Sequence, residues 1–342
     1  MDGNTKVIWF NHWFSAIINT INSIKQAFPD IKIIGSNRSA DCVYAYAVDE
    51  FYIEPSDASG DEYNQFVLNF CKEHNVDIMF VKSHSNDVAN IIEELAQAGT
   101  TVICERKPLR EMFESKHNVY SRLSRHGYKY IPNYFITDSV DGFKDAFKNI
   151  DKNGLVCIKY DNDEGAGSFR VVTDSFLTTK HFDEPSMNIL SYDNAVKILE
   201  LAERDNKYKE MLVMPYLSGP EVSVDCYMSK TKGFIALPRY KLGGRIKEIK
   251  LEQRLIDDCV EIQNIFGMHY IYNVQYRWDK DGSPRLLEIN PRISGGMHLT
   301  SMCGFNLVIE LIADILGIES NQSITNIKPC KVTQYETPVI IK

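Results

Sequence analysis

The residues best suited to chemistry form a short run near the C-terminus, Leu286-Leu287-Glu288-Ile289-Asn290-Pro291-Arg292. Side chains alternate along a strand, so a strand here makes Glu288 and Asn290 face the same way. A carboxylate and an amide oxygen side by side suit a hard cation such as Mg²⁺. Arg292 follows on that side, where it could neutralise charge on a phosphoryl or acyl-phosphate oxygen. The alternative is an ordinary polar pair on a solvated strand face.

A glutamine on the preceding predicted strand belongs with these residues. Gln275 lies in the strand expected at 270–278, and Asp279-Lys280-Asp281-Gly282 predicts a hairpin turn to the next strand. Paired strands of a hairpin can place Gln275 beside Glu288. Gln275 is therefore a further candidate for the same site.

A lysine followed by a glycine-containing loop is the second candidate. Lys159 ends an apolar strand, and the loop 161–168 contains Gly165 and Gly167. Glycines allow backbone N–H groups to wrap an anion, and a lysine adds a point charge, as in a loop that closes over phosphates. A flexible hairpin with a solvated lysine is the alternative. Lys116 opens a predicted helix, where a surface lysine is the usual interpretation.

The third candidate is an apolar segment that stops at a proline. Met211-Leu212-Val213-Met214-Pro215 predicts a strand at a sheet edge, followed by Tyr216 and, further on, Glu221. The unpaired backbone groups of an edge suit an adenine ring, and a nearby carboxylate suits two ribose hydroxyls. A strand, a turn and a second strand with an exposed glutamate is the alternative.

The elements that must position these residues predict an α/β protein. Before Lys107-Pro108, apolar strand patterns alternate with helical ones, which predicts a parallel sheet with helices on both faces. The carboxyl ends of such strands face a ligand crevice, so Asn11 and Lys82-Ser83-His84 are expected there, unless they are ordinary loop residues. The strand at 7–10 is followed by no glycine, which disfavours a dinucleotide-binding fold, and a P-loop motif is absent.

Composition excludes several classes of protein. The chain has 342 residues, of which 44% are hydrophobic and 25% charged, as in a globular protein of two or three domains. The net charge of −8 argues against nucleic acid or an anionic membrane as a partner. We expect no leader peptide, and no apolar run approaches the ~20 residues of a membrane span. The eight cysteines form no C-x-x-C pair, which indicates reduced thiols and a cytoplasmic protein.

In their order and spacing, the three candidates resemble the ATP-grasp superfamily. The segment 217–224 is similar to the hinge of D-alanine–D-alanine ligases. Asn273-Val274-Gln275, Glu288–Arg292 and Gly295-Gly296 are similar to the carbamoyl-phosphate synthetase large-subunit branch. The opening 7–11, with Phe169-Arg170, also resembles the ATP-grasp proteins of tellurite-resistance operons.

The resemblance implies a fold and a division of the chain. The class is α/β, with α+β character in the C-terminal half. The implied domains are a pre-ATP-grasp α/β domain with a parallel sheet at 1–108, a central subdomain with the lid and phosphate loop at 109–215, and a C-terminal subdomain with the metal and nucleotide site at 216–342.

The resemblance also implies ligand-binding roles. ATP is expected to bind at Lys116, Lys159, Gly165, Gly167, Ser168, Met214, Pro215, Tyr216, Leu217 and Glu221. One or two Mg²⁺ ions, with Mn²⁺ as the alternative ion, are expected at Gln275, Glu288 and Asn290. Arg292 and Lys159 are the implied catalytic residues. Many family members have an acidic residue where this chain has Gln275, which weakens the expectation of a second metal ion.

The implied activity is ATP-dependent ligation of a carboxylate to an amine, or to a thiol, through an acyl phosphate. The expected partners are these small molecules, with no nucleic acid and no membrane, and a homodimer is a common assembly in the family. Two other functions on the same fold stay open, namely a kinase or phosphotransferase and a non-catalytic ATP-binding regulator.

Overall fold

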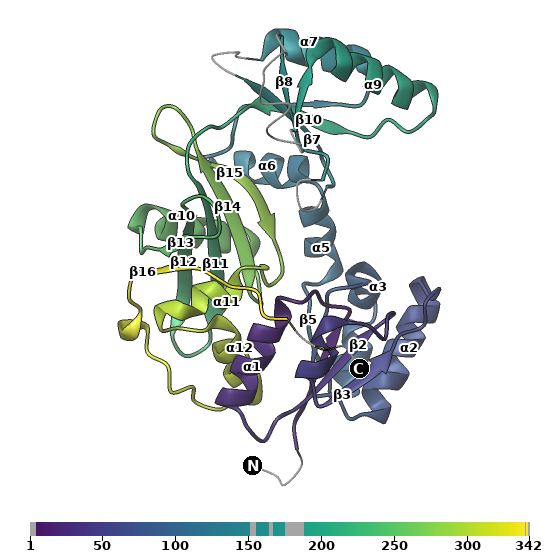
Figure 1. Ribbon diagram of the computed structural model, residues 1–342, viewed down its shortest axis with the longest axis vertical. Coiled ribbons are helices and arrows are strands. Elements are labelled where there is room, and N and C mark those ends of the chain that lie inside the picture. The colour runs from purple at the N-terminus through teal and green to yellow at the C-terminus, as the bar shows by residue number, and fades with distance from the viewer. Residues whose placement is uncertain (1–4, 151–154, 164–166, 175–187, 339, 341–342) are drawn as a thin grey trace. The chain divides into compact units, whose positions relative to one another are not determined.

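A computed structural model describes residues 5–150, 155–163, 167–174, 188–338 and 340 (Figure 1). The chain divides into two compact units. Unit 1 comprises Met1–Glu111, Val222–Gln275 and Ile289–Lys342, and unit 2 comprises Met112–Glu221 and Tyr276–Glu288. The three predicted domain ranges remain a prediction.

Unit 1 opens with a parallel five-stranded sheet in the order β3-β2-β1-β4-β5. The strands are β1 (Val7–Asn11), β2 (Lys32–Asn37), β3 (Glu50–Ile53), β4 (Ile78–Phe80) and β5 (Thr101–Ile103). The helices between them are α1 (Ile17–Ala27), the 3-10 helix η1 (Val43–Ala47), α2 (Gly60–Glu73), α3 (Ser85–Ala89) and α4 (Ile92–Gln97). This arrangement confirms the α/β class and the parallel N-terminal sheet.

The central strand β1 shows why this sheet forms. All five of its residues are buried, as expected for a parallel strand covered on both faces. Ile8 and Phe10 pack in a cluster that includes α1, whereas Val7 and Trp9 pack in a second cluster with α2 and α4. The two faces of the sheet therefore lie in two separate cores.

A second sheet has the strand order β15-β14-β11-β12-β13-β16. Its strands are β11 (Glu221–Ser229), β12 (Gly233–Lys241), β13 (Lys247–Ile249), β14 (Tyr272–Trp278), β15 (Pro284–Asn290) and β16 (Cys330–Val332). The helices α10 (Gln253–Phe266), α11 (Met297–Thr300) and α12 (Leu307–Leu316) accompany it, with the 3-10 helices η2 (Ser301–Cys303) and η3 (Ile324–Asn326). The predicted β14–β15 hairpin is present, and both of its strands contribute residues to both units.

Helix α12 is the buried helix of unit 1. Asn306 caps its first turn through Val308 N, and Gly317 ends it in the left-handed conformation at φ 65°. In Figure 1, α12 lies beside α1, and the two share one hydrophobic cluster with the N-terminal sheet. Among the described residues, no single helix is long and apolar enough to cross a bilayer, although the bent pair Met297–Cys303 and Leu307–Leu316 passes by length and composition.

Unit 2 contains a five-stranded sheet in the order β6-β10-β7-β8-β9. Its strands are β6 (Phe135–Thr137), β7 (Val156–Tyr160), β8 (Arg170–Thr173), β9 (Ile189–Ser191) and β10 (Met211–Pro215). The helix α5 (Lys107–Glu114) leads into α6 (Lys116–Arg125), and α7 (Val140–Asn149) and α9 (Tyr192–Arg204) cover one sheet face. The sequence boundary at Lys107-Pro108 is thus the start of a helix, where proline is accepted.

The predicted edge strand is an interior strand of the sheet, which corrects that expectation. β10 pairs with β7 along its length and with β6 at Met211–Val213. Met214 and Pro215 extend past β6 and pair with β7 alone. Only the last two residues of β10 therefore have an unpaired side, because β6 is short.

Candidate active site

In unit 2, Lys159 lies on the sheet face opposite α7 and α9. Its neighbour Ile158 points into the helix-covered core, so alternation along β7 directs Lys159 to the other face. The Nζ atom donates to the backbone oxygen of Leu287 at 3.2 Å. Burial, and next the positive charge of Lys116, lower the pKa of Lys159 to about 8, although Glu288 acts in the opposite sense. The charges of Lys116 and Glu288 therefore both act on Lys159.

Lys116 is buried, so the interpretation as a surface lysine is wrong. Its side chain is 9% exposed, and Nζ donates to the backbone oxygens of Asp161 at 3.1 Å and Asp163 at 2.7 Å. The Asp161 carboxylate in turn accepts from His117 N at 2.7 Å, near the start of α6. Lys116 thus fixes the beginning of the loop that follows Lys159.

The loop itself is closed by an aspartate that sequence reasoning missed. Asp163 Oδ2 accepts from both the backbone N and the Oγ of Ser168, each at 2.6 Å. Ser168 Oγ also accepts from Tyr160 N at 2.8 Å. Asp163 before a glycine-rich stretch is a turn signal that could have been recognised. Gly165 lies outside the described residues, and Gly167 is adjacent to Asp163.

Met214 and Leu217 lie near the end of β10 and are almost fully buried. In the register of β10 with β7, Leu212 lies opposite Lys159 and Met214 opposite Cys157. These four side chains are therefore on the face that lacks α7 and α9. The residues predicted for adenine and for phosphate share one face of the unit 2 sheet.

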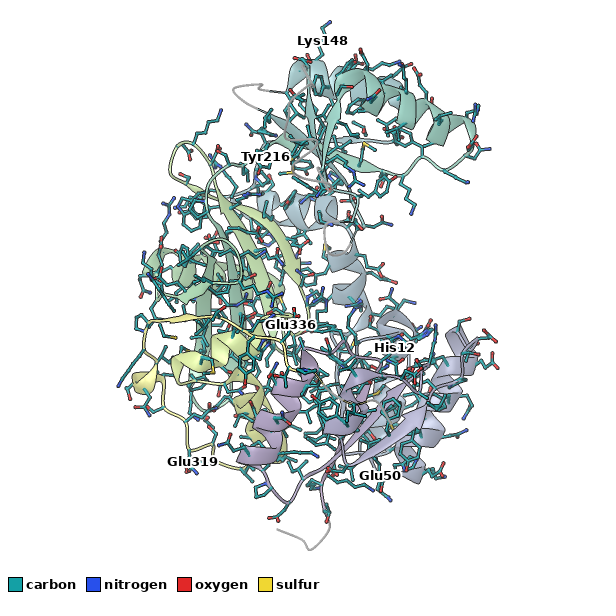
Figure 2. The ribbon with its side chains drawn as sticks, viewed as in Figure 1. His12, Glu50, Lys148, Tyr216, Glu319 and Glu336 are labelled. Carbon is teal, nitrogen blue, oxygen red and sulfur yellow. The ribbon has the colours of Figure 1, made fainter. Side chains whose placement is uncertain are left out.

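The neighbouring Arg277, which the sequence places on the same strand face as Gln275 but without a role, holds the segment after β10. Tyr216, labelled in Figure 2, donates its backbone N–H to Leu155 O at 2.7 Å. The Arg277 guanidinium lies 5.0 Å from the centre of the Tyr216 ring and donates to its OH at 3.3 Å and to Gly219 O at 3.2 Å. Arg277 thereby fixes the ring at the predicted adenine position. Glu221 begins β11 and is partly buried.

A cavity of about 630 Å³ in unit 2 adjoins the same loop. Its lining includes Lys159, Gly167 and Ser168, together with the cationic side chains of Arg170 and Lys209. Ile158, Met211 and the α9 residues Ala195, Ile198 and Leu199 also line it, so this cavity lies on the α9 side of the sheet, whereas the side chain of Lys159 is directed to the opposite face.

In unit 1, the remaining predicted metal ligands have the expected strand positions. Gln275 lies on β14, and Asn290 is the last residue of β15, after the buried Ile289. Arg292 follows, with its backbone N donating to Asn290 O at 2.8 Å and its Nη1 to Ile293 O at 3.4 Å.

The donor set fits Mg²⁺ only in combination with further anionic ligands. Gln275, Glu288 and Asn290 offer oxygen atoms, which a hard cation prefers. Within the described part of the chain, however, no group of three or more His, Cys, Asp or Glu side chains could hold a metal ion. The predicted set has one carboxylate, so it would need further anionic oxygens, such as those of phosphates, to hold the ion.

The comparisons with known proteins agree with the resemblance to ATP-grasp proteins that the sequence motifs suggested. Residues 207–338 match a family model described as ATP-grasp in the biosynthetic pathway with Ter operon. The arginine-specific carbamoyl phosphate synthase large chain of Bacillus subtilis (strain 168) is 21% identical over 305 residues, which cover 84% of this chain and 26% of the relative. The chain thus spans about a quarter of that relative's length.

Three solved structures share the fold. The biotin carboxylase domain of the Hydrogenobacter thermophilus 2-oxoglutarate carboxylase, bound to MgADP and bicarbonate, has a TM-score of 0.66 at 16% identity, covering 94% of this chain and 72% of its own. The Staphylococcus aureus N5-carboxyaminoimidazole synthetase with ADP gives 0.66 at 13%, covering 95% and 81%. The L-amino acid ligase of Bacillus licheniformis gives 0.67 at 13%, covering 95% and 77%.

Proposed function

We propose that this protein uses Mg²⁺-ATP to join a carboxylate to an amine or a thiol through an acyl phosphate. The observation that carries the proposal is the shared face of the unit 2 sheet. Lys159 and Met214 lie on that face, and the charges of Lys116 and Glu288 act on Lys159. A binding site for a nucleoside triphosphate with its Mg²⁺ ion requires cationic groups, a carboxylate and a buried apolar side chain.

Each predicted residue has a proposed role. Lys116, Lys159, Gly165, Gly167 and Ser168 contact the phosphates, and Met214, Pro215, Tyr216 and Leu217 hold the adenine. Glu221 binds the ribose hydroxyls. Gln275, Glu288 and Asn290 hold one or two Mg²⁺ ions, which would offset the charge on the phosphate oxygens.

The proposed reaction has two steps. An oxygen of the substrate carboxylate attacks the γ-phosphorus in line, and the bond to ADP breaks. Lys159 and Arg292 stabilise the negative charge that develops on the transferred phosphoryl oxygens. The amine nitrogen or thiol sulfur then attacks the acyl carbon, phosphate leaves, and the nucleophile loses its proton. A closed loop at 161–168 would keep water from the acyl phosphate.

The names of similar proteins support this class of reaction. The B. subtilis relative is a carbamoyl phosphate synthase, and the B. licheniformis structure is an L-amino acid ligase. Two of the similar structures hold ADP or MgADP. A homodimer and a cytoplasmic location remain predictions.

The test is an assay of ADP release over a panel of carboxylates, each with and without amines and thiols. A ligase releases ADP and phosphate only when both substrates are present. ADP release with a stable phosphorylated product would instead identify a kinase. Tight ATP binding without turnover across the panel would identify a regulator.

A further inference from the structure

The proposed function does not explain the cavity of about 630 Å³ beside α9 in unit 2. The cavity lies on the sheet face that α7 and α9 cover, whereas Lys159 directs its side chain to the opposite face (Figure 1). Its volume is within the range of small-molecule sites, about 300–1,000 Å³. A ligand here would therefore be a second ligand, separate from the proposed nucleotide.

The strand pairings determine which side chains face this cavity. Arg170 on β8 lies opposite Ile158 on β7, and Met211 on β10 lies opposite Tyr160 on β7. Residues directly opposite one another on antiparallel strands share a face of the sheet. Ile158 and Met211 belong to the hydrophobic core under α7 and α9. Arg170 and Tyr160 are therefore directed to that face as well.

The wall that α9 contributes to the cavity is aliphatic. Ala195 and Leu199 are buried and line the cavity, and Ile198, on the same side of the helix, lines it while 50% exposed. Among the described lining residues, Tyr160 is the only aromatic one, and Lys209 Nζ lies over its ring at 5.4 Å from the centre. This wall suits a hydrocarbon chain better than a flat aromatic ring.

Two cationic side chains at the cavity, Arg170 and Lys209, form no ion pair among the described residues. Arg170 Nη1 donates to two backbone oxygens of its own hairpin, at 2.7 and 3.1 Å, and these acceptors carry no charge. The one carboxylate in the described lining, that of Asp163, accepts from Ser168 N and Oγ. Two positive charges against one negative charge favour an anionic ligand.

We propose that this cavity binds an aliphatic carboxylate, with its hydrocarbon chain against α9 and its head group at Arg170 and Lys209. A carboxylate fits because the planar donors of an arginine match its two oxygens, and such charge-assisted hydrogen bonds are strong. The chain contributes because it removes the aliphatic wall, including the half-exposed Ile198, from water.

The cavity also adjoins the loop 161–168, which we propose to close over the phosphates of ATP. Gly167 and Ser168 belong to this loop and line the cavity, whereas the side chain of Lys159 is on the opposite face of the sheet. The carboxylate and the nucleotide should therefore bind at the same time. This expectation of joint binding rests on the proposed function, but the binding of the carboxylate does not.

The test measures binding of octanoate to the full chain by saturation-transfer NMR, which detects weak binding through the C–H protons of the probe. Octanol and octylammonium have the same chain with a neutral or a cationic head group. Acetate has the same head group without the chain. These three compounds separate the contributions of charge and of hydrocarbon.

Two pairs of variants locate the probe. Ile198→Glu places a carboxylate at the cavity, and Leu201→Glu is its matched control, because Leu201 is also on α9 and 50% exposed but is not among the lining residues. Lys209→Gln removes a cation of the cavity, and Lys207→Gln removes an exposed one two residues away. Arg170→Gln removes the second cation. Circular dichroism identifies any variant that fails to fold.

We expect wild type, Leu201→Glu and Lys207→Gln to bind octanoate equally. Ile198→Glu and Arg170→Gln should bind it at least about tenfold more weakly, as for a lost charge-assisted hydrogen bond, and the exposed Lys209→Gln about threefold more weakly. Absence of octanoate binding to wild type, or an equal loss in Ile198→Glu and Leu201→Glu, would overturn the proposal.

The other probes test the class of ligand. Octanol or octylammonium binding as tightly as octanoate would overturn the anionic head group, and acetate binding as tightly would overturn the role of the chain.

Mg²⁺ with the non-hydrolysable ATP analogue AMP-PNP separates this proposal from the ligase assignment. We expect saturating analogue to leave octanoate bound, and its displacement would overturn the placement in this cavity. If the analogue does not bind and no pair of substrates yields ADP, the ligase function fails, and the octanoate measurements alone still decide the carboxylate site. If turnover is found and octanoate binds all variants equally, the carboxylate site fails and the ligase function stands.

Discussion

Lys159 is a lysine whose surroundings favour its neutral form. Burial and the charge of Lys116 lower the pKa of Lys159 to about 8, and Glu288 only partly offsets them. A bound triphosphate would add several negative charges and raise this pKa again. If Lys159 contacts ATP, nucleotide binding must therefore take up a proton above pH 8.

We predict that the affinity for Mg²⁺-ATP falls as the pH rises through 8. Near pH 9 most of the apo protein has neutral Lys159, so protonating it costs binding free energy, and the Kd should rise roughly tenfold relative to pH 7. Isothermal titration in buffers of different ionisation enthalpy measures both the Kd and the proton uptake. Lys159→Arg keeps its charge, so its Kd should not vary over this range. A wild-type Kd that is constant from pH 7 to 9.5 would remove Lys159 from the site.

The second prediction at this scale concerns Glu288. Glu288→Gln should reduce Mg²⁺-dependent ADP release by more than about 100-fold, because the predicted metal site has one carboxylate. The loss of this charge should also lower the pKa of Lys159 further, since Glu288 acts to raise it. The measurements are turnover against Mg²⁺ concentration and a thermal melt to verify folding. Turnover near the wild-type rate would show that the metal assignment is wrong.

The sequence predicted residue types better than it predicted residue environments. Lys159 could be recognised because it ends an apolar strand beside glycines. The burial of Lys116 could not, because its partners are backbone oxygens of Asp161 and Asp163, which leave no pattern in residue type. The cavity beside α9 joins residues of separate strands and a helix and became visible only through tertiary structure.

At the scale of elements, the segment after β10 depends on one close backbone approach. Gly219 N donates to Trp278 O, and Trp278 N donates to Pro220 O, each at 3.1 Å. A Cβ on Gly219 would lie 2.6 Å from the Trp278 Cβ and 2.7 Å from its backbone oxygen. Because one of these atoms is backbone, rotation of a side chain cannot relieve the overlap.

Gly219→Ala should therefore destabilise the protein by about 1–3 kcal/mol, as expected for an overpacked contact. It should also weaken ATP binding, because Arg277 and Gly219 together hold Tyr216. Urea unfolding and an ATP titration measure the two effects. Gly295→Ala serves as the control, since its Cβ has ordinary space. Wild-type stability in Gly219→Ala would contradict the geometry described for this segment.

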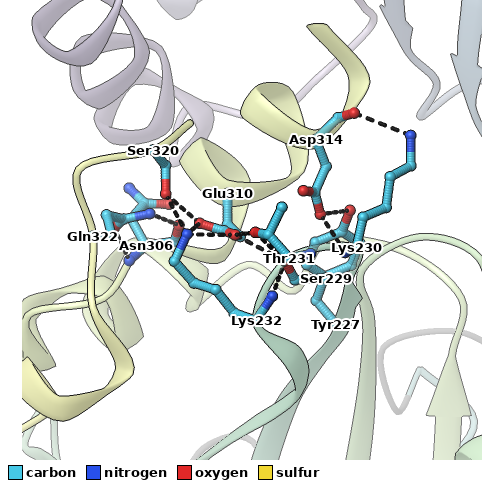
Figure 3. Close-up of polar contacts among 10 residues, drawn as sticks. All are labelled: Tyr227, Ser229, Lys230, Thr231, Lys232, Asn306, Glu310, Asp314, Ser320 and Gln322. Atoms are coloured by element: carbon cyan, nitrogen blue, oxygen red, sulfur yellow. Dashed lines mark hydrogen bonds and ion pairs between the residues drawn. The ribbon is translucent and has the colours of Figure 1, made fainter. Parts of the chain in front are cut away.

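A buried carboxylate joins another pair of elements, the β11–β12 hairpin and α12 (Figure 3). Glu310 is 1% exposed and accepts from Lys232 Nζ at 2.9 and 3.0 Å, from Ser229 Oγ at 2.8 Å, and from Ser320 Oγ. Burial acts to raise the pKa of Glu310, but the hydrogen bonds from Ser320, Lys232 and Ser229 together lower it. The network therefore stabilises the ionised carboxylate.

Glu310→Gln should cost about 2–3 kcal/mol of stability, because it leaves the partly buried Lys232 without its counter-charge. Adding Lys232→Met should recover part of the loss, since an apolar side chain does not need that charge. A double-mutant cycle of unfolding free energies tests the coupling. Additive effects of the two substitutions would show that the ion pair contributes nothing.

The elements that could be predicted are those with a clear local pattern in the sequence. The alternating pattern before Lys107, the β14–β15 hairpin and α12 with Gly317 all carried clear signals and are present. The three-residue strands β13 and β16 were missed, because pairing with distant strands forms them rather than local propensity. The neighbours of β10 were mistaken for the same reason.

At the scale of the whole molecule, buried thiols set the response to alkaline pH. Burial raises the pKa of Cys71 to about 12, that of Cys104 to about 11 and that of Cys157 to about 12. In the unfolded chain these thiols ionise near pH 9. Above that pH the unfolded state therefore binds fewer protons than the native state, and stability falls as the pH rises.

The expected loss between pH 9.5 and 10.5 is about 1.4 kcal/mol per fully buried thiol, or roughly 4 kcal/mol for these three. Lys159 has the opposite effect on stability. Its pKa is lower in the native state than in the unfolded chain, so between pH 8 and about 10.5 the unfolded state binds more protons than the native state, and stability rises with pH. Urea unfolding followed by circular dichroism under reducing conditions, at several pH values, measures the net slope. Cys71→Ala removes one ionising group and should make the slope shallower by about 1.4 kcal/mol per pH unit, whatever it does to stability at pH 7. An unchanged slope in this variant would mean that Cys71 ionises equally in the folded and unfolded states. That result would contradict the burial of Cys71, which lies on α2, in the second hydrophobic cluster of the N-terminal sheet.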